Sequence, residues 1–271
     1  MSGPKQKTPD GSGELARLRV TVRHLSAAWP TVLQRRHFLR AMARSEALRS
    51  ALEKTYAGHV FNAMHGAMSF DLVRAVGALI LDHRRRSASL WHAVASLRKS
   101  AVVKQLRAQV YPDPEMQLVG RANAEIHAAL ARIHRNAFDT VFNDLPAQLE
   151  EIDTTVFATP VARTIKDVRD KVVAHAAVEH DGTDWKIWVV NRDTNLTYAQ
   201  LDDYIDACTK AVDRLNHLVL RTAFSFDDLP GIDQGYVNEY IDALLIGLRE
   251  QKQEKERQRE ERLKRTQELT P

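Results

Sequence analysis

Two residues of this chain have the types and the spacing that phosphate-transfer chemistry requires. Arg169 and His175 lie six positions apart in the segment Arg169-Asp170-Lys171-Val172-Val173-Ala174-His175. The imidazole of a histidine, whose ordinary pKa is about 6.5, can accept or deliver a proton near neutral pH. The guanidinium of an arginine is always charged and can stabilise the negative charge of a pentacoordinate phosphate. One such pair is sufficient, without a metal, to cleave RNA through its own 2′-hydroxyl, leaving a 2′,3′-cyclic phosphate and a 5′-hydroxyl.

The neighbours of this pair can assist the same chemistry. Asp170 can orient Arg169 or His175, and Lys171, four residues before His175, lies on its helix face and can hold a substrate phosphate. The alternative interpretation is a solvated helix face with ordinary ion pairs and a histidine that has no catalytic task. An arginine followed by a histidine after four to six residues is not a specific pattern, because three other pairs also fit it: Arg19 with His24, Arg86 with His92, and Arg121 with His127.

The composition predicts an all-α protein to position these residues. Eleven glycines and nine prolines interrupt 271 residues, and strong helix formers dominate between them. The helix that carries Arg169 is predicted to begin at Thr159-Pro160 and to run over about residues 160–178. Other predicted helices cover residues 14–29 and 31–57, divided by Pro30, then 59–81, 90–111 and 115–143, the last ending near Pro146.

The apolar segment 59–81 is predicted to be the central helix. Gly58, Gly66 and Gly77 favour close approach between helices in the interior of a bundle. The turn that follows contains His83-Arg84-Arg85-Arg86, which is either a solvated loop or a contact for RNA phosphate.

The last third of the chain predicts a short β insertion and a long charged helix. The turn dipeptide Asp181-Gly182 precedes β-branched and aromatic residues at 185–190, which indicate a strand or hairpin. Thr197 and Gln200 have capping-box spacing, so a helix is predicted from there to about residue 224. A final helix is predicted from near Tyr236, and its charges alternate over residues 249–268, which indicates a solvated helix or, alternatively, a nucleic-acid contact.

Composition also excludes several classes of protein. The single cysteine, Cys208, cannot form an internal disulfide, which favours a cytoplasmic protein. No apolar run approaches the roughly 20 residues that a bilayer demands, so no membrane association is expected. The net charge of +4 and the pI of about 9.2 permit a polyanionic partner. The histidine pairs lack the spacing of a helical zinc site, so neither metal nor cofactor is expected: His59 with His65, and His127 with His134.

The heptapeptide from Arg169 to His175 resembles the signature of HEPN domains, which are helical bundles of prokaryotic toxins, CRISPR effectors and phage-defence proteins. The upstream segments resemble the abortive-infection branch of that superfamily: Phe70-Asp71-Leu72-Val73-Arg74, Leu79-Ile80-Leu81-Asp82 and Ser87-Ala88-Ser89-Leu90. The resemblance spans about residues 14–224 and implies an antiparallel helical bundle. The predicted organisation is a disordered leader over residues 1–13, the helical domain over 14–224, and a C-terminal helical extension over 225–271.

The resemblance implies a homodimer with a shared site. Six residues at about 100° each place Arg169 and His175 about 120° apart around a helix, so one copy makes an incomplete pocket. A twofold pairing can bring two arginines and two histidines to one groove. Asp71 and Arg74, three residues apart on an apolar helix, form either an ion pair or a second polar wall of that groove that binds substrate.

Three functions follow as alternatives. The first is a metal-independent endoribonuclease that acts in phage defence or as a toxin, with RNA as substrate and with an antitoxin or regulatory protein as a further partner. The second is a non-catalytic HEPN subunit that binds RNA or takes part in an assembly, because a fold does not fix a function. The third is a structural helical protein unrelated to either.

Overall fold

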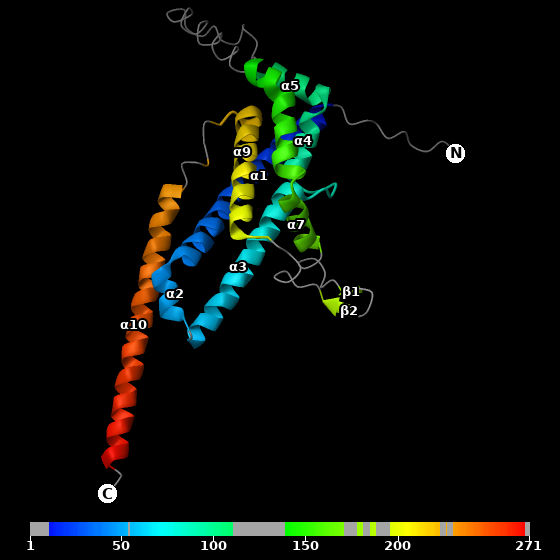
Figure 1. Cartoon of the computed structure of the whole chain (residues 1–271). Helices are drawn as coiled ribbons and strands as arrows, with labels where there is room; N and C mark the ends of the chain where they lie inside the picture. The colour runs from blue at the N-terminus through cyan, green and yellow to red at the C-terminus, as the bar shows by residue number, and fades with distance from the viewer. Residues whose placement is uncertain are drawn as a thin grey trace, which may run out of the picture. The chain divides into compact units, whose positions relative to one another are not determined.

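The chain is all-α, as its composition predicted (Figure 1). The computed structural model describes residues 11–53, 55–110, 139–170, 178–180, 185–187, 196–222, 226 and 230–268. These residues form two compact units, Met1–Trp29 with Val73–Phe226 and Pro30–Leu72 with Asp227–Pro271. The predicted division into leader, helical domain and C-terminal extension stays a prediction.

The first helix, α1 (Gly11–Arg44), continues through Pro30, so the predicted division at this proline was wrong. A proline inside a helix removes the backbone bond to the carbonyl four residues earlier and costs about 3 kcal/mol. Residues on both sides of Pro30 compensate for that cost, because Trp29 and Val32 are buried. The Trp29 indole also donates a hydrogen bond of 3.0 Å to the Thr209 hydroxyl.

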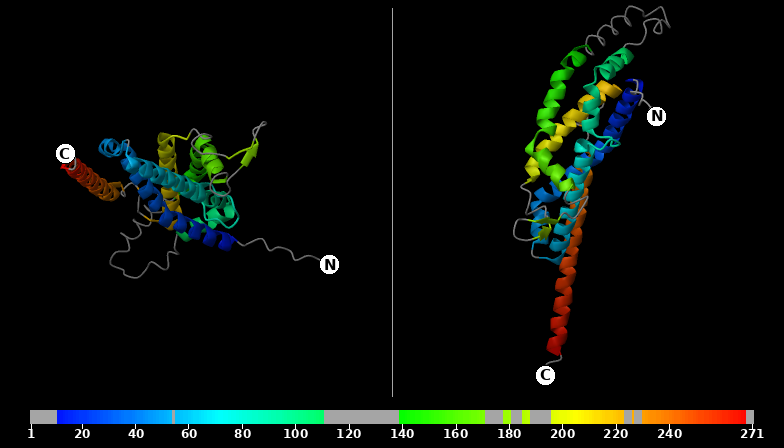
Figure 2. Two further views of the ribbon diagram at one scale, coloured as in Figure 1. Left: turned by 90° about the horizontal axis from the view of Figure 1, so that it is seen from below. Right: turned by 90° about the vertical axis from the view of Figure 1, so that its right-hand side faces the viewer.

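The first unit contains short helices that follow α3 (Tyr56–Leu81). They are α4 (Leu90–Leu97), α5 (Ser100–Val110), a helix over residues 139–152 with the π-helical turn Asp153–Phe157, α7 (Pro160–Val168), and α9 (Tyr198–Leu215) with the π-helical turn Asn216–Leu220. Figures 1 and 2 show α9 beside α7 and beside the turn at 153–157. Two predictions were wrong, since the predicted helix 90–111 is divided at Arg98-Lys99 and Pro146 lies inside a helix.

The core of the first unit consists of aliphatic side chains from each of these helices. Val76, Ile80, Val94, Ile165 and Ile205 are almost completely buried. Burial of such side chains is the main favourable term in folding, at about 1.5–3 kcal/mol for each. Cys208 is buried among them as a free thiol.

A two-stranded antiparallel hairpin interrupts the helices. Strand β1 (Val178–His180) pairs with β2 (Trp185–Ile187) with Glu179 opposite Lys186. The hairpin agrees with the strand predicted from residue 185, while residues 188–190 lie outside the described part of the chain. The next helix, α9, opens with the predicted capping box, in which the Thr197 hydroxyl accepts the Gln200 N–H and the Gln200 side chain accepts the Thr197 N–H.

The second unit contains the C-terminal part of α1, α2 (Glu46–Leu52), the N-terminal part of α3, and α10 (Pro230–Glu268). Phe38 and Tyr240 pack with ring centroids 5.4 Å apart. The last helix begins at Pro230 and not near Tyr236, because a proline is well suited to the first turn of a helix. Over residues 249–265 its side chains are almost all exposed, as the alternating charges predicted.

Helix α3 is long and apolar enough, by length and composition, to cross a membrane, although no such segment was expected from the sequence. The core helix of a water-soluble protein meets the same criterion. Val73, Val76, Ile80 and Leu81 in the C-terminal part of α3 are buried within the protein. Packing inside the first unit therefore accounts for the apolar character of that part of the helix.

Candidate active site around Arg169

Helix α7 fixes the direction from which Arg169 enters the site. The Thr159 hydroxyl accepts a hydrogen bond of 3.0 Å from the Ala162 N–H, and Pro160 follows in the first turn, as predicted. Ile165 and Val168 anchor the helix in the core. At Arg169 the backbone widens into a π-helical turn, a feature that is frequent at functional sites.

The Arg169 side chain is held by three groups in a nearly buried position, with 16% of its surface exposed. Its Nε and Nη2 atoms each lie 2.7 Å from Asp170 Oδ1. Its Nη1 atom donates to the Gly77 carbonyl at 3.3 Å and lies 3.9 Å from Asp82 Oδ1. These contacts orient the guanidinium, while each terminal nitrogen keeps a further N–H donor for a ligand.

Gly77 allows α3 and α7 to approach this closely. A Cβ atom at residue 77 would lie 3.3 Å from Ile165 Cγ2 and 3.4 Å from Arg169 Cδ. These separations are tighter than most van der Waals contacts, so Ile165 or Arg169 would have to shift by a few tenths of an ångström to accept a larger residue. The glycine that the sequence marked as a point of helix approach thus places the backbone of α3 against the Arg169 side chain.

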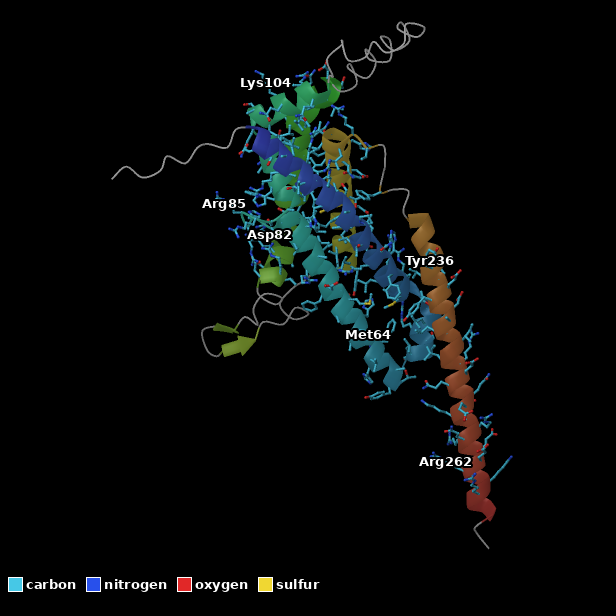
Figure 3. The ribbon with its side chains drawn as sticks, turned by 180° about the vertical axis from the view of Figure 1, so that it is seen from behind. Met64, Asp82, Arg85, Lys104, Tyr236 and Arg262 are labelled. Atoms are coloured by element: carbon cyan, nitrogen blue, oxygen red, sulfur yellow. The ribbon has the colours of Figure 1, made fainter. Side chains whose placement is uncertain are left out.

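Asp82 is a site residue that the sequence analysis did not select. Its Oδ1 atom lies 3.9 Å from Arg169 Nη1 and accepts the Arg84 N–H at 3.1 Å. Its backbone carbonyl accepts the hydroxyls of Ser87 and Ser89 at 3.0 and 2.6 Å. Figure 3 shows Asp82 at the end of α3 and Arg85 projecting from the turn that follows. A charged residue directly after an apolar helix was the signal that could have indicated it.

His83 places an imidazole near Arg169. Its ring stacks on Trp91 of α4, with the ring centroids 4.4 Å apart. Burial is the largest cause that lowers the pKa of His83 below its ordinary value. The positive charges of Lys166, Arg169 and His92 lower this pKa further, and the Asp82 carboxylate opposes them, so His83 lies within electrostatic range of Arg169.

The structure brings together only part of the predicted site. Arg169 and Asp170 are in contact, whereas Lys171 and His175 lie outside the described residues. Asp71 forms an ion pair of 2.5 Å with Arg35 in the second unit, and Arg74 is exposed on α3. The catalytic role of His175, the substrate contacts of Lys171, Asp71 and Arg74, and the homodimer therefore stay predictions.

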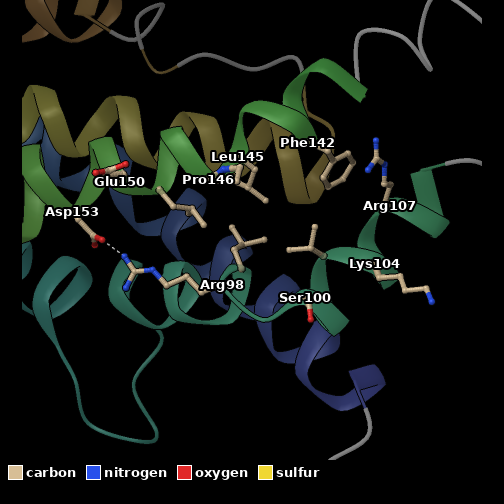
Figure 4. Close-up of a pocket in the computed structure, with 12 residues that line it drawn as sticks. Arg98, Ser100, Lys104, Arg107, Phe142, Leu145, Pro146, Glu150 and Asp153 are labelled. Atoms are coloured by element: carbon tan, nitrogen blue, oxygen red, sulfur yellow. Dashed lines mark hydrogen bonds and ion pairs between the residues drawn. The ribbon is translucent and has the colours of Figure 1, made fainter.

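A separate groove of about 630 Å³ lies between α4–α5 and the helix over residues 139–157 (Figure 4). Leu97, Val103 and Leu149 are among the apolar side chains that line it, and an Arg98–Asp153 ion pair crosses its rim. Among the described residues of its lining there is neither histidine nor cysteine. Within the described ranges, no group of three or more His, Cys, Asp or Glu residues is arranged to hold a metal ion.

Comparison with known proteins supports the resemblance drawn from the sequence. A family model described as AbiU2, a HEPN-type domain associated with abortive infection, matches residues 21–240. The match includes Arg169, Gly77 and Asp82. No curated protein and no solved structure matches the chain.

Proposed function

Because the chain belongs to the AbiU2 family of HEPN domains, we propose that this abortive-infection protein is a metal-independent endoribonuclease. The observation that carries the proposal is the Arg169 guanidinium, which Asp170, the Gly77 carbonyl and Asp82 orient in a nearly buried position. Such preorganised donors stabilise charge that develops in a transition state.

The proposed reaction is a transesterification within the RNA. The 2′-oxygen forms a bond to phosphorus and the bond from phosphorus to the 5′-oxygen breaks, which gives a 2′,3′-cyclic phosphate and a 5′-hydroxyl. In a homodimer, one His175 accepts the proton of the 2′-hydroxyl and the other donates a proton to the leaving 5′-oxygen. Arg169 donates hydrogen bonds to the phosphate oxygens, and Asp170 positions Arg169.

The test is incubation of the purified protein with RNA in excess EDTA, beside the same protein carrying Arg169→Ala or His175→Ala. We expect cleavage by the unmodified protein and at least about a 100-fold lower rate in each variant, as for the loss of a transition-state donor or a general acid–base group. Arg163→Ala, which removes an exposed arginine of the same helix, is the matched control and should cleave normally.

The chemical form of the products checks the mechanism. Mass spectrometry of the fragments should show 2′,3′-cyclic phosphate ends, and DNA of the same sequence should stay intact because it lacks the 2′-hydroxyl. Light scattering should show a dimer, and a strictly monomeric active enzyme would contradict the shared site.

A non-catalytic subunit is the second candidate, and the carboxylates around Arg169 favour it. Asp170 at 2.7 Å and Asp82 at 3.9 Å neutralise much of the arginine charge, as expected for an arginine that only stabilises the fold. Intact RNA under all conditions, together with RNA binding that Arg169→Ala leaves unchanged, would support this function.

A further inference from the structure

Three arginines converge on one hollow of the first unit. Arg17 from α1 and Arg85 and Arg86 from the turn after α3 line a hollow of about 630 Å³, and none of the described residues in its lining carries a carboxylate. This volume lies within the roughly 300–1,000 Å³ of small-ligand sites and is ample for more than one phosphate group. The arginine side chains are exposed, so a ligand can reach them.

The turn that carries two of these arginines is held in a defined conformation. The Ser87 N–H and hydroxyl both donate to the Arg84 carbonyl, at 2.9 and 2.8 Å. His92 Nε2 lies 2.7 Å from the same carbonyl, and the Arg17 guanidinium donates to the Arg85 carbonyl. The backbone of the turn is therefore preformed, which reduces the entropy lost on binding.

Nearby carboxylates do not balance the charge of the hollow. Glu14, three residues before Arg17 on α1, forms an ion pair of 2.5 Å with Lys99. Asp82 is directed to Arg169 and to the Arg84 N–H. In the part of the chain that the structure describes, no carboxylate lines the hollow beside these three cations. They repel one another, and a bound polyanion would relieve that repulsion.

From this geometry we propose that Arg17, Arg85 and Arg86 form an anchor for the phosphodiester backbone of the RNA strand that reaches Arg169. The proposal rests on the proposed function for the identity of the polyanion. Asp82 connects the two sites, because the same carboxylate faces Arg169 and holds the start of the arginine turn. Guanidinium forks suit phosphate oxygens, and contacts to the backbone position a strand without reading its sequence.

The experiment compares RNA binding by two double variants of the full chain. Arg85→Ala/Arg86→Ala removes two of the three positive charges that line the hollow. Arg259→Ala/Arg265→Ala removes two positive charges from the exposed surface of α10. Both are placed in a His175→Ala background, and binding of a fluorescent single-stranded RNA is measured by anisotropy in EDTA over a range of salt concentrations. Thermal unfolding of each variant checks that the fold is retained.

We expect the hollow variant to bind RNA about 25-fold more weakly at 0.1 M salt. Its plot of log affinity against log salt concentration should be less steep by about 1.4, because each phosphate contact on a single strand contributes about 0.7 to that slope. Arg85→Lys/Arg86→Lys should restore much of the affinity through charge. The α10 variant should bind nearly as well as its parent.

Three results would overturn the anchor. They are an unchanged affinity and salt slope in the hollow variant, an equal loss in the α10 variant, and a mononucleotide that binds the hollow as tightly as RNA does. An unchanged RNA affinity combined with loss of a protein partner would assign the arginines to that partner instead.

Failure of the anchor and failure of the nuclease are distinguishable. If the protein with His175 intact does not cleave RNA, yet RNA binding depends on Arg85 and Arg86, the anchor stands without the enzyme. If RNA is cleaved and the hollow variant binds and cleaves normally, the enzyme stands and the anchor does not.

Discussion

Arg169 and Gly77 lie far apart in the sequence and meet where α7 crosses α3. The Arg169 Nη1 atom donates to the Gly77 carbonyl at 3.3 Å, and the Arg169 Cβ lies 3.6 Å from the position that a Cβ on residue 77 would occupy. The small residue thus serves both the packing of two helices and the orientation of the guanidinium. Substituting Gly77 and a glycine elsewhere on α3 distinguishes the effect of this close contact from the general effect of glycine on helix stability.

Gly77→Ala should destabilise the protein relative to Gly66→Ala by about 1–3 kcal/mol, because overpacking at residue 77 forces its neighbours to move. At Gly66, on the same helix, a Cβ would meet nothing within 4 Å. There alanine should stabilise the helix by about 0.5–1 kcal/mol. Urea unfolding of the two variants measures the difference, and equal free energies of unfolding would contradict the close approach.

Asp82→Ala should lower the free energy of unfolding by about 0.5–1.5 kcal/mol more than Asp82→Asn does, because asparagine keeps an acceptor for the Arg84 N–H and alanine does not. Asp167→Asn, an exposed carboxylate of α7, controls for the change in net charge. Chemical denaturation gives both values. If Asp82→Asn is as unstable as Asp82→Ala, the ion pair with Arg169 and not the turn would be the main contribution.

Lys166→Ala should raise the pKa of His83 toward, but not fully to, its ordinary value of 6.5, because burial, the largest cause of the lowered pKa, remains. An NMR titration of the imidazole protons measures this shift. Lys210→Ala, on α9, should leave the pKa of His83 unchanged. If Lys166→Ala also leaves the pKa of His83 unchanged, the two charges are not close to each other.

The lowered pKa of His83 also gives the sign of a pH effect on stability. Between the lowered pKa and the ordinary value, the unfolded chain binds a proton that the folded chain does not. The contribution of His83 is therefore complete above pH 6.5 and is lost as pH falls through the folded-state pKa. His83→Gln should make the free energy of unfolding less dependent on pH below 6.5.

Thr209→Val should lower the free energy of unfolding by about 1–3 kcal/mol, because it leaves the buried indole N–H of Trp29 without its acceptor. Thr209→Ser keeps the hydroxyl and should recover most of this loss. Denaturation followed by tryptophan fluorescence measures both variants. The matched control is Thr154→Val, because the hydroxyl of Thr154 is exposed. If the two valine substitutions lower the free energy of unfolding equally, the hydrogen bond between Trp29 and Thr209 does not contribute as proposed.

The sequence alone determined the features that depend on neighbours along the chain. The caps at Thr159 and Thr197 and the all-α class follow from local backbone chemistry, so they were predicted and confirmed. The segment from Arg169 to His175, together with the upstream segments within residues 70–90, indicated the HEPN superfamily, which the AbiU2 match confirmed.

Only the tertiary structure decided where helices tolerate a proline and which charges meet. Pro30 and Pro146 lie within helices because burial of the residues beside them outweighs one lost backbone bond, a balance that local patterns do not contain. The pairing of Arg169 with Asp82, and of Asp71 with Arg35, joins residues from different helices. Such pairs depend on how the helices pack, and that packing is a property of the whole folded chain.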